Sequence, residues 1–417
     1  PVESTGHEAG LVTTTTSATP TERSWHLTGL SVVVLVAFVA AVAQSFGRFT
    51  LGVVLPAVRD DLGLSNTLAG SLATVNVGAY LVGTLAAGWA TARFRLLSVM
   101  RVGVSLVAAA MLSATLANGA TAVAGALFVM GFGGALTWIP APVVAASAVA
   151  PQRRGLAVAM MGSGMGLGVV FSGQLAGFVR AAQGDEAWRT VYLVQGLLGV
   201  VVVAGAWLLL GQRQNRPSGG AGLGGFTALR RMTGWLPFTV AYTAFGFMYL
   251  LILAFLTTKL EDDNGWSANR ASLAFTLLGV AMVFGGPVFI AIAQKFGPRN
   301  ALIIAFSGWA VATVIMIPAT PIPTLAASVG DGLLFSGMPT LFTLYVVLNT
   351  TDADYGPSFA AATFAFGVAQ MISPQLGGFL ADVAGSFTPV FAVSVGLAIV
   401  GLVAVTRMPV VGRPASD

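Results

Sequence analysis

A long apolar run near the start of the chain contains one full positive charge. Residues 31–56 read SVVVLVAFVAAVAQSFGRFTLGVVLP, and a helix needs about 20 residues to cross a bilayer. Arg48 is the charged residue, and Gln44 precedes it by one helical turn, so both lie on one helix face. A charge in the hydrocarbon region costs about 3 kcal/mol or more and rarely faces lipid. The run therefore predicts a membrane protein with a polar interior around Arg48.

The planar guanidinium of Arg48 suits a carboxylate or another anion, because it can donate two parallel hydrogen bonds to it. We therefore consider Arg48, with Gln44 beside it, as a clamp for an anionic substrate. The alternative, to which we give equal weight, is a structural ion pair or gate between helices.

Asp331 is the acid that lies well inside an apolar run, LAASVGDGLLFSG. Counted along the helix rise, Asp331 and Arg48 lie at similar depth in their spans. A carboxylate held away from water favours its protonated form, so Asp331 is a candidate for carrying a coupling proton. The alternative is a fixed ion pair with Arg48. We favour coupling, because a substrate that competes for the arginine would open such a pair.

The composition fits a membrane protein and excludes several kinds of site. Hydrophobic residues make up 56% of the chain and charged residues 8%, whereas soluble domains carry about 25% charged residues. Cysteine is absent, and the two histidines, His7 and His26, precede the first apolar run. No phosphate-binding GxxxxGK[ST] loop occurs, and Asp331 lacks the second intramembrane aspartate that a protease would need. We expect no enzyme activity, no cofactor and no metal site.

Apolar runs and polar links divide the chain into two sets of spans. The twelve apolar runs cover residues 31–56, 67–92, 98–117, 121–147, 155–179, 189–210, 235–257, 271–293, 300–317, 324–348, 359–381 and 388–406. The longest link between them separates six spans from six. The predicted domains are a disordered tail (1–26), an N-terminal bundle (27–211), a linker (212–234), a C-terminal bundle (235–408) and a second tail (409–417).

The basic residues predict the orientation. With the amino terminus inside, fourteen of them fall on the cytoplasmic side: Arg23, Arg93, Arg95, Arg101, Arg153, Arg154, Arg213, Arg216, Arg230, Arg231, Lys295, Arg299, Arg407 and Arg413. Five fall on the outer side: Arg59, Arg180, Arg189, Lys259 and Arg270. This excess favours cytoplasmic termini. It also explains the net charge of +5 without nucleic acid as a partner.

The fifth and eleventh spans repeat each other. They read GLGVVFSGQLAGF from Gly166 and GVAQMISPQLGGF from Gly367. At one constant offset, Gly166, Ser172, Gln174, Leu175, Gly177 and Phe178 recur as Gly367, Ser373, Gln375, Leu376, Gly378 and Phe379. A repeat at equivalent spans of two six-span halves indicates duplication, which is typical of secondary transporters that bind substrate between the halves.

The chain resembles the major facilitator superfamily over all twelve spans. The run RFTLGVVLPAV…LGLS…AG…N…GAYLVG, from Arg48 to Gly83, is similar to its uncharacterised YbfB/YjiJ-type branch. So are YTAFGFMYLLILAFL, from Tyr242, and FGVAQMISPQLGGFLADVAGSF, from Phe366. The resemblance implies an all-α membrane protein with twelve transmembrane helices in two pseudo-symmetric six-helix bundles. One departure is that Ala92 and Gln294 stand where the superfamily carries acidic residues on the inner face.

The resemblance also implies a central cavity lined by spans one, four, seven and ten. Trp138, Tyr242 and Tyr249 belong to these spans and are candidate substrate contacts, although membrane aromatics more often pack or anchor. Asn76 and Gln370 lie in spans two and eleven, which the resemblance places face to face. Hydrogen bonding between helices is our first interpretation of these two residues, and substrate contact is the second.

These observations predict a secondary active transporter that moves a small organic solute, with an anionic group favoured, by alternating access and with proton coupling. The rival is a proton-antiporting exporter of hydrophobic or cationic drugs, in which Asp331 contacts the substrate. A transport-dead membrane sensor is the alternative of another class. We expect a monomer in the cytoplasmic membrane, with the small-molecule substrate, protons and the lipid bilayer as its partners.

Overall fold

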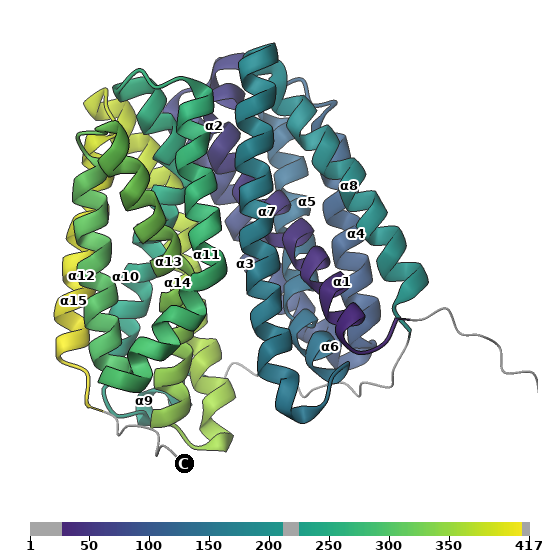
Figure 1. Cartoon of the computed structure of the whole chain (residues 1–417), viewed down its shortest axis with the longest axis vertical. Coiled ribbons are helices and arrows are strands. Elements are labelled where there is room, and N and C mark those ends of the chain that lie inside the picture. Colours follow the sequence, from purple (N-terminus) through teal and green to yellow (C-terminus); the bar gives the residue numbers. More distant parts are fainter. Residues whose placement is uncertain (1–26, 212–224, 411–417) are drawn as a thin grey trace, which may run out of the picture.

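The computed structural model describes residues 27–211 and 225–410, and within these ranges it contains helices and no strands. The predicted disordered tail (1–26), residues 212–224 of the linker and residues 411–417 of the second tail lie outside the described residues. Helices before and after the linker form two groups that stand side by side (Figure 1).

The first group comprises α1 (Leu30–Ala40), the π-helix η1 (Ala41–Phe49), α2 (Thr50–Asp61), α3 (Asn66–Arg93), α4 (Leu96–Ala114), α5 (Ala120–Trp138), α6 (Ala141–Ser147), η2 (Pro151–Arg153), α7 (Arg154–Gln183), η3 (Asp185–Ala187) and α8 (Trp188–Leu209). The short helix α9 (Gly225–Arg231) lies in the predicted linker. The second group comprises α10 (Trp235–Thr258), η4 (Lys259–Asp263), α11 (Ala268–Phe296), α12 (Pro298–Met316), α13 (Pro321–Asn349), α14 (Asp352–Ala384) and α15 (Thr388–Thr406).

Eleven described helical segments are long and apolar enough to cross a membrane. The predicted eleventh span lies within α14, whose 33 residues also suffice in length. Gln370, Pro374 and Gln375 lower the hydropathy of its middle, so α14 is not among the eleven. The all-helical membrane fold is therefore confirmed, whereas the exact number of twelve spans stays a prediction.

Two local features show why the spans begin and bend where they do. Ser65 and Ser267 precede α3 and α11, and their hydroxyls accept hydrogen bonds from the backbone amides of Leu68 and Arg270, at 3.2 and 3.4 Å. Such caps satisfy amides that a helix start leaves unpaired. The fourth span is interrupted between α5 and α6 at Pro140, where the ring removes a backbone donor.

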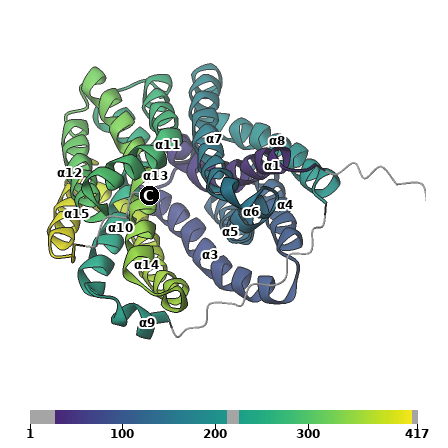
Figure 2. The same cartoon turned by 60° about the horizontal axis from the view of Figure 1, so that its bottom comes forward.

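The two groups meet mainly along two pairs of helices, α3 with α14 and α7 with α11 (Figure 2), and also where α2 packs against α10. The repeated glycines lie at these crossings. Gly166 and Gly177 of α7 approach α11, and Gly367 and Gly378 of α14 approach α3. A side chain at Gly378 would collide with the backbone carbonyl of Asn66. The repeat in the sequence therefore marks two equivalent helix crossings, where small residues let backbones come close.

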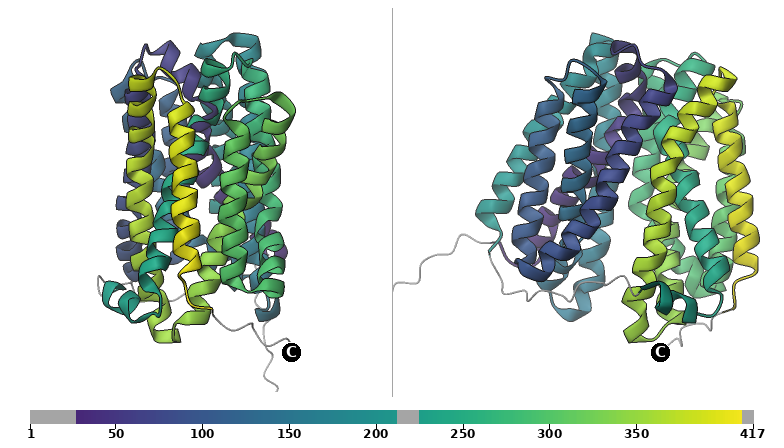
Figure 3. Two further views of the ribbon diagram at one scale, coloured as in Figure 1. Left: turned by 90° about the vertical axis from the view of Figure 1, so that its left-hand side faces the viewer. Right: turned by 180° about the vertical axis from the view of Figure 1, so that it is seen from behind.

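We name the two ends of the molecule by their residues. The acidic end contains the turns at residues 61–66, 183–188, 258–268 and 384–388, and the termini end contains the start of α1 and the end of α15. The groups lie close together at the acidic end and spread apart toward the termini end (Figure 3, right).

Candidate functional site

Arg48 lies in the π-helix η1, where the first span is wider than an α-helix. Inserted π turns occur often at functional sites because they re-aim side chains. Arg48 Nη1 donates to Gln44 Oε1 at 3.1 Å, so the pair predicted on one helix face is in contact. Arg48 Nη2 donates to Gln370 Oε1 of α14 at 3.4 Å. The guanidinium is thus shared between the two groups of helices.

An aromatic ring supports the flat face of the guanidinium. Arg48 Cζ lies 4.0 Å from the ring centre of Tyr80 in α3 and 5.6 Å from that of Phe49. Cation–π contacts of this kind contribute about 0.5–2 kcal/mol, the larger values where water is excluded. Tyr80 was not among the site residues predicted from the sequence. The only signal for it was its position one helical turn after Asn76, in the GAYLVG motif.

No acid neutralises Arg48 within the described ranges. None of the ion pairs formed there includes it, and its Nε is buried without a hydrogen-bond partner. A partly buried cation with only neutral partners is incompletely compensated, because amide oxygens carry partial charges. The arrangement leaves donor capacity on a positive group, which is what an incoming anion requires.

A second layer of polar and aromatic groups holds Gln370. Its Nε2 donates to the hydroxyl of Tyr249 in α10, and both side chains are buried. The Tyr249 ring lies 4.9 Å from Phe335 and 5.9 Å from Phe366, measured between centres. The structure thus brings four predicted residues, Arg48, Gln44, Gln370 and Tyr249, into one connected cluster.

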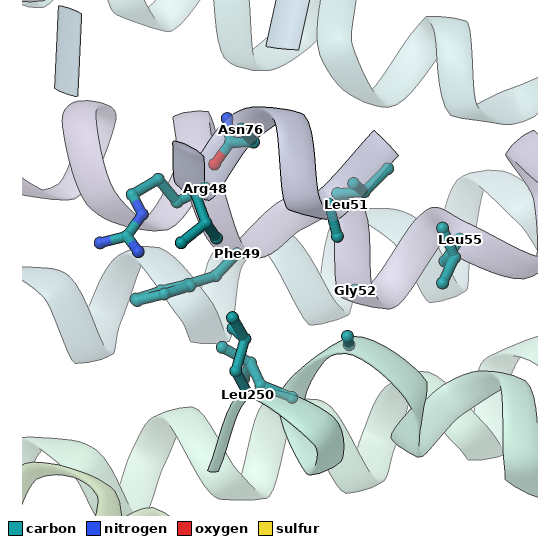
Figure 4. Close-up of a pocket in the computed structure, with 11 residues that line it drawn as sticks. Arg48, Phe49, Leu51, Gly52, Leu55, Asn76 and Leu250 are labelled. Atoms are coloured by element: carbon teal, nitrogen blue, oxygen red, sulfur yellow. The ribbon is translucent and has the colours of Figure 1, made fainter. Parts of the chain in front are cut away.

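Apolar side chains close this cluster toward the acidic end. Phe49 and Phe335 of α13 meet edge to face with ring centres 5.6 Å apart. A crevice beside them is lined by Arg48, Phe49, Leu51, Gly52, Leu55, Ala73, Asn76, Val77, Leu250, Leu253 and Ala254. In Figure 4 Arg48 reaches out from one end of the crevice, and Leu250 of α10 lies across from the first span.

The other predicted site residues lie apart from the guanidinium contacts. Asn76 Nδ2 donates to the carbonyls of Gly47 and Leu127, at 3.0 and 2.9 Å, which agrees with its interpretation as a bond between helices. Tyr242 stacks against Phe366, with ring centres 4.5 Å apart. Trp138 ends α5, and no described contact joins it to Arg48.

Asp331 is fully buried in α13, and neither carboxylate oxygen has a hydrogen-bond partner in the described part of the chain. The fixed Arg48–Asp331 pair, one of two alternatives from the sequence, is not formed in this structure. Asp331 lies one helical turn from Phe335, on the side of that ring toward the acidic end. An ionised carboxylate without any donor would be costly at this position, so the protonated form fits the surroundings.

Among the described residues no group of three or more His, Asp or Glu side chains could hold a metal ion. The residues around Arg48 can bind a ligand through the charge of the guanidinium, the amide groups of Gln44 and Gln370, and the aromatic rings.

Comparisons with known proteins agree with this architecture. A hexuronate transporter of Bacillus subtilis is 26% identical over 92% of this chain and 96% of its own length. Among solved structures, a mutant of the nucleoside transporter NupG superposes with a TM-score of 0.75 at 12% identity, covering 90% of this chain and 98% of that one. A D-xylose-proton symporter superposes with a TM-score of 0.73 at 14% identity, covering 91% and 98%.

The family model described as "Uncharacterised MFS-type transporter YbfB" matches residues 40–406. This range includes the first span from η1 onward and every later helix. The chain therefore belongs to the YbfB-type family of major facilitator transporters.

Proposed function

We propose that this transporter moves a small organic anion by alternating access and that Arg48 binds the anionic group. The observation that carries the proposal is the set of partners around Arg48, which in the described part of the chain comprises two amide oxygens, two aromatic rings and no carboxylate. A substrate carboxylate would supply the missing negative charge and could bind the guanidinium through two hydrogen bonds.

The surrounding groups favour a carboxylate that also carries hydroxyls. Gln44, Gln370 and Tyr249 offer amide and phenol groups that can donate and accept hydrogen bonds. A sugar acid combines both features, and the relative from Bacillus subtilis is a hexuronate transporter. We therefore place hexuronate-like sugar acids first among the anions to be tested.

Gln370 has a specific part in this proposal. The hydrogen bond from Arg48 to the Gln370 amide oxygen is long, at 3.4 Å, and this oxygen carries no full charge. A substrate carboxylate is therefore a stronger acceptor for Arg48 than Gln370 is. We propose that Gln370 holds the guanidinium in place while the site is empty, and that the substrate carboxylate replaces Gln370 as the partner of Arg48 when it binds. Because Gln370 belongs to the second group of helices, this exchange would change a contact between the two halves.

Asp331 is the proposed proton carrier. It is buried without a donor, one helical turn from Phe335, which in turn contacts Tyr249 and Phe49. Movement of Phe335 during the cycle would change access to Asp331. We further propose that the termini end faces the cytoplasm, as the excess of basic residues favours, and that the protein works as a monomer.

Thermal stability of the purified protein, with D-glucuronate and with D-glucose at two pH values, tests the substrate class. The two sugars differ in the carboxylate, so we expect stabilisation by glucuronate alone and none in Arg48→Gln. Counterflow in proteoliposomes then separates a transporter from a sensor, which would bind without exchange. Binding of cationic drugs that survives Arg48→Gln and is lost in Asp331→Asn would instead establish the drug exporter, which the unpaired Asp331 also permits.

A further inference from the structure

Polar contacts between the two halves gather at the acidic end. Arg180, at the end of α7, binds Glu261 of η4 through two parallel hydrogen bonds, Nη1–Oε1 and Nη2–Oε2, both 2.8 Å long. The Arg180 side chain is 3% exposed and that of Glu261 is 14% exposed. This is the paired geometry that makes arginine–carboxylate contacts strong, in surroundings where water screens them little.

A second pair crosses the halves beside the first. Arg59 of α2 donates to Asp262 from both terminal nitrogens of its guanidinium, from Nη2 at 3.1 Å. Arg59 also donates to Asn66 within its own half, at 3.0 Å, which fixes the direction of the guanidinium. In both pairs the first half supplies the arginine and the second half supplies the acid.

A third contact uses a helix start instead of an arginine. Asp382, near the end of α14, accepts hydrogen bonds from the backbone amides of Asn66 and Thr67 at 3.0 and 2.7 Å, and from the Thr67 hydroxyl. These amides begin α3, where the helix dipole favours negative charge. Asp382 therefore connects α14 to the start of α3, the two helices that pack closely at Gly378.

Two arginines at the termini end each bind a helix end of their own half. Arg101 binds the carbonyl of Ala206 at 2.8 Å in the first half, and Arg299 binds the carbonyl of Val405 at 3.2 Å in the second. Arg231 of the linker helix α9 pairs with Asp354 of the second half. The segments of the first half at this end, residues 88–101 and 147–156, contain arginines and no acid.

We propose that Arg180–Glu261, Arg59–Asp262 and Asp382 on the start of α3 form the gate at the acidic end. These contacts hold the halves together on that side while the termini end is apart. They must all break when the transporter opens toward the acidic end, so their strength sets how often that state forms. None of these residues was among the site residues predicted from the sequence.

The gate can be tested by cysteine labelling of purified protein, which needs no substrate and no assumption about orientation. The chain has no cysteine, so Leu55→Cys introduces a single thiol in a background that needs no further change. Leu55 is 1% exposed and lines the crevice between α2 and α10. Opening at the acidic end would expose it. We expect Glu261→Gln, which removes the partner of Arg180 in the second half and leaves only the longer contact with Asp185 of its own half, to raise the maleimide labelling rate about tenfold.

Asp61→Asn is the matched control, because Asp61 pairs with Arg189 at the same end but within the first half. We expect it to leave the labelling rate unchanged. Reversing the pair, Arg180→Glu with Glu261→Arg, should return the rate to that of the parent. Equal labelling in parent, Glu261→Gln and Asp61→Asn would overturn the proposal.

If Glu261→Gln does not fold, Asp262→Asn takes its place, because it breaks the second pair across the halves at a more exposed acid. Faster labelling in Asp262→Asn than in the parent supports the gate, and labelling at the parent rate contradicts it. Because the readout does not involve an anion, failure of the gate and failure of the proposed substrate class are distinguishable.

Discussion

Replacing Gln370 by glutamate would place a carboxylate beside Arg48 without changing the size of the side chain. Gln370 Oε1 lies 3.4 Å from Arg48 Nη2, so the new carboxylate would occupy the position that we assign to the substrate. The built-in acid would then compete with every anion from solution. We expect Gln370→Glu to fold normally and to bind anionic substrate weakly.

The size of the effect follows from this distance. Two unit charges about 3.4 Å apart attract by roughly 5 kcal/mol at an effective dielectric constant of about 20. Removal of the new carboxylate from water offsets about half of this, because the Gln370 side chain is 4% exposed. The remaining ~2–3 kcal/mol must be overcome by the substrate, which weakens its affinity roughly 30- to 150-fold.

Gln370→Leu separates the two roles that Gln370 could have. If Gln370 only holds Arg48 in the empty site, its removal destabilises that state and binding becomes about two- to tenfold tighter. If Gln370 is itself a substrate ligand, binding becomes weaker. Both variants are measured by calorimetry on purified protein with the best anion from the stability screen.

Gln174→Glu is the matched control for the charge change. Gln174 is at the position of α7 that repeats Gln375, and its described partner is Thr276 and not Arg48. We expect its anion affinity to equal that of the parent. Parent-like affinity in Gln370→Glu, in a protein of unchanged thermal stability, would refute the assignment of Arg48 as the anion site.

Four further predictions follow from single contacts. Arg48→Gln should abolish anion-induced stabilisation in thermal melts, whereas Arg48→Lys should keep a weak response, because lysine retains the charge without the paired donors. Tyr80→Leu removes the ring 4.0 Å from the guanidinium and should weaken binding about two- to tenfold in the same titration. Asp331→Asn should leave anion binding intact and abolish the pH dependence of uptake in proteoliposomes, and an unaltered pH profile would remove its role as proton carrier. Gly378→Val sets a branched side chain against the carbonyl of Asn66 and should lower the yield of monodisperse protein on size exclusion, whereas Gly396→Val, where nothing lies within 4 Å, should not.

The sequence alone was sufficient to predict the features that depend on neighbouring residues, such as the positions of the helices and contacts within one helix. Hydropathy placed most of the helices within a few residues of their observed ends, because lipid requires every backbone polar group to be bonded within the helix. The exception is α14, which begins at Asp352, well before the predicted start at residue 359. The contact of Gln44 with Arg48 follows from their spacing along one helix. The repeated glycines predicted duplication, and they proved to lie at the two equivalent crossings of the halves.

The contacts between distant spans were decided only by the tertiary structure. Tyr80 under Arg48, Phe335 against Phe49, and the pair Arg180–Glu261 each join residues whose approach depends on how far each helix is rotated and shifted along its axis. Hydropathy constrains neither quantity. Depth along the spans suggested that Arg48 and Asp331 could pair, but no such pair forms in the structure, because equal depth in a bilayer does not fix the direction in which a side chain points.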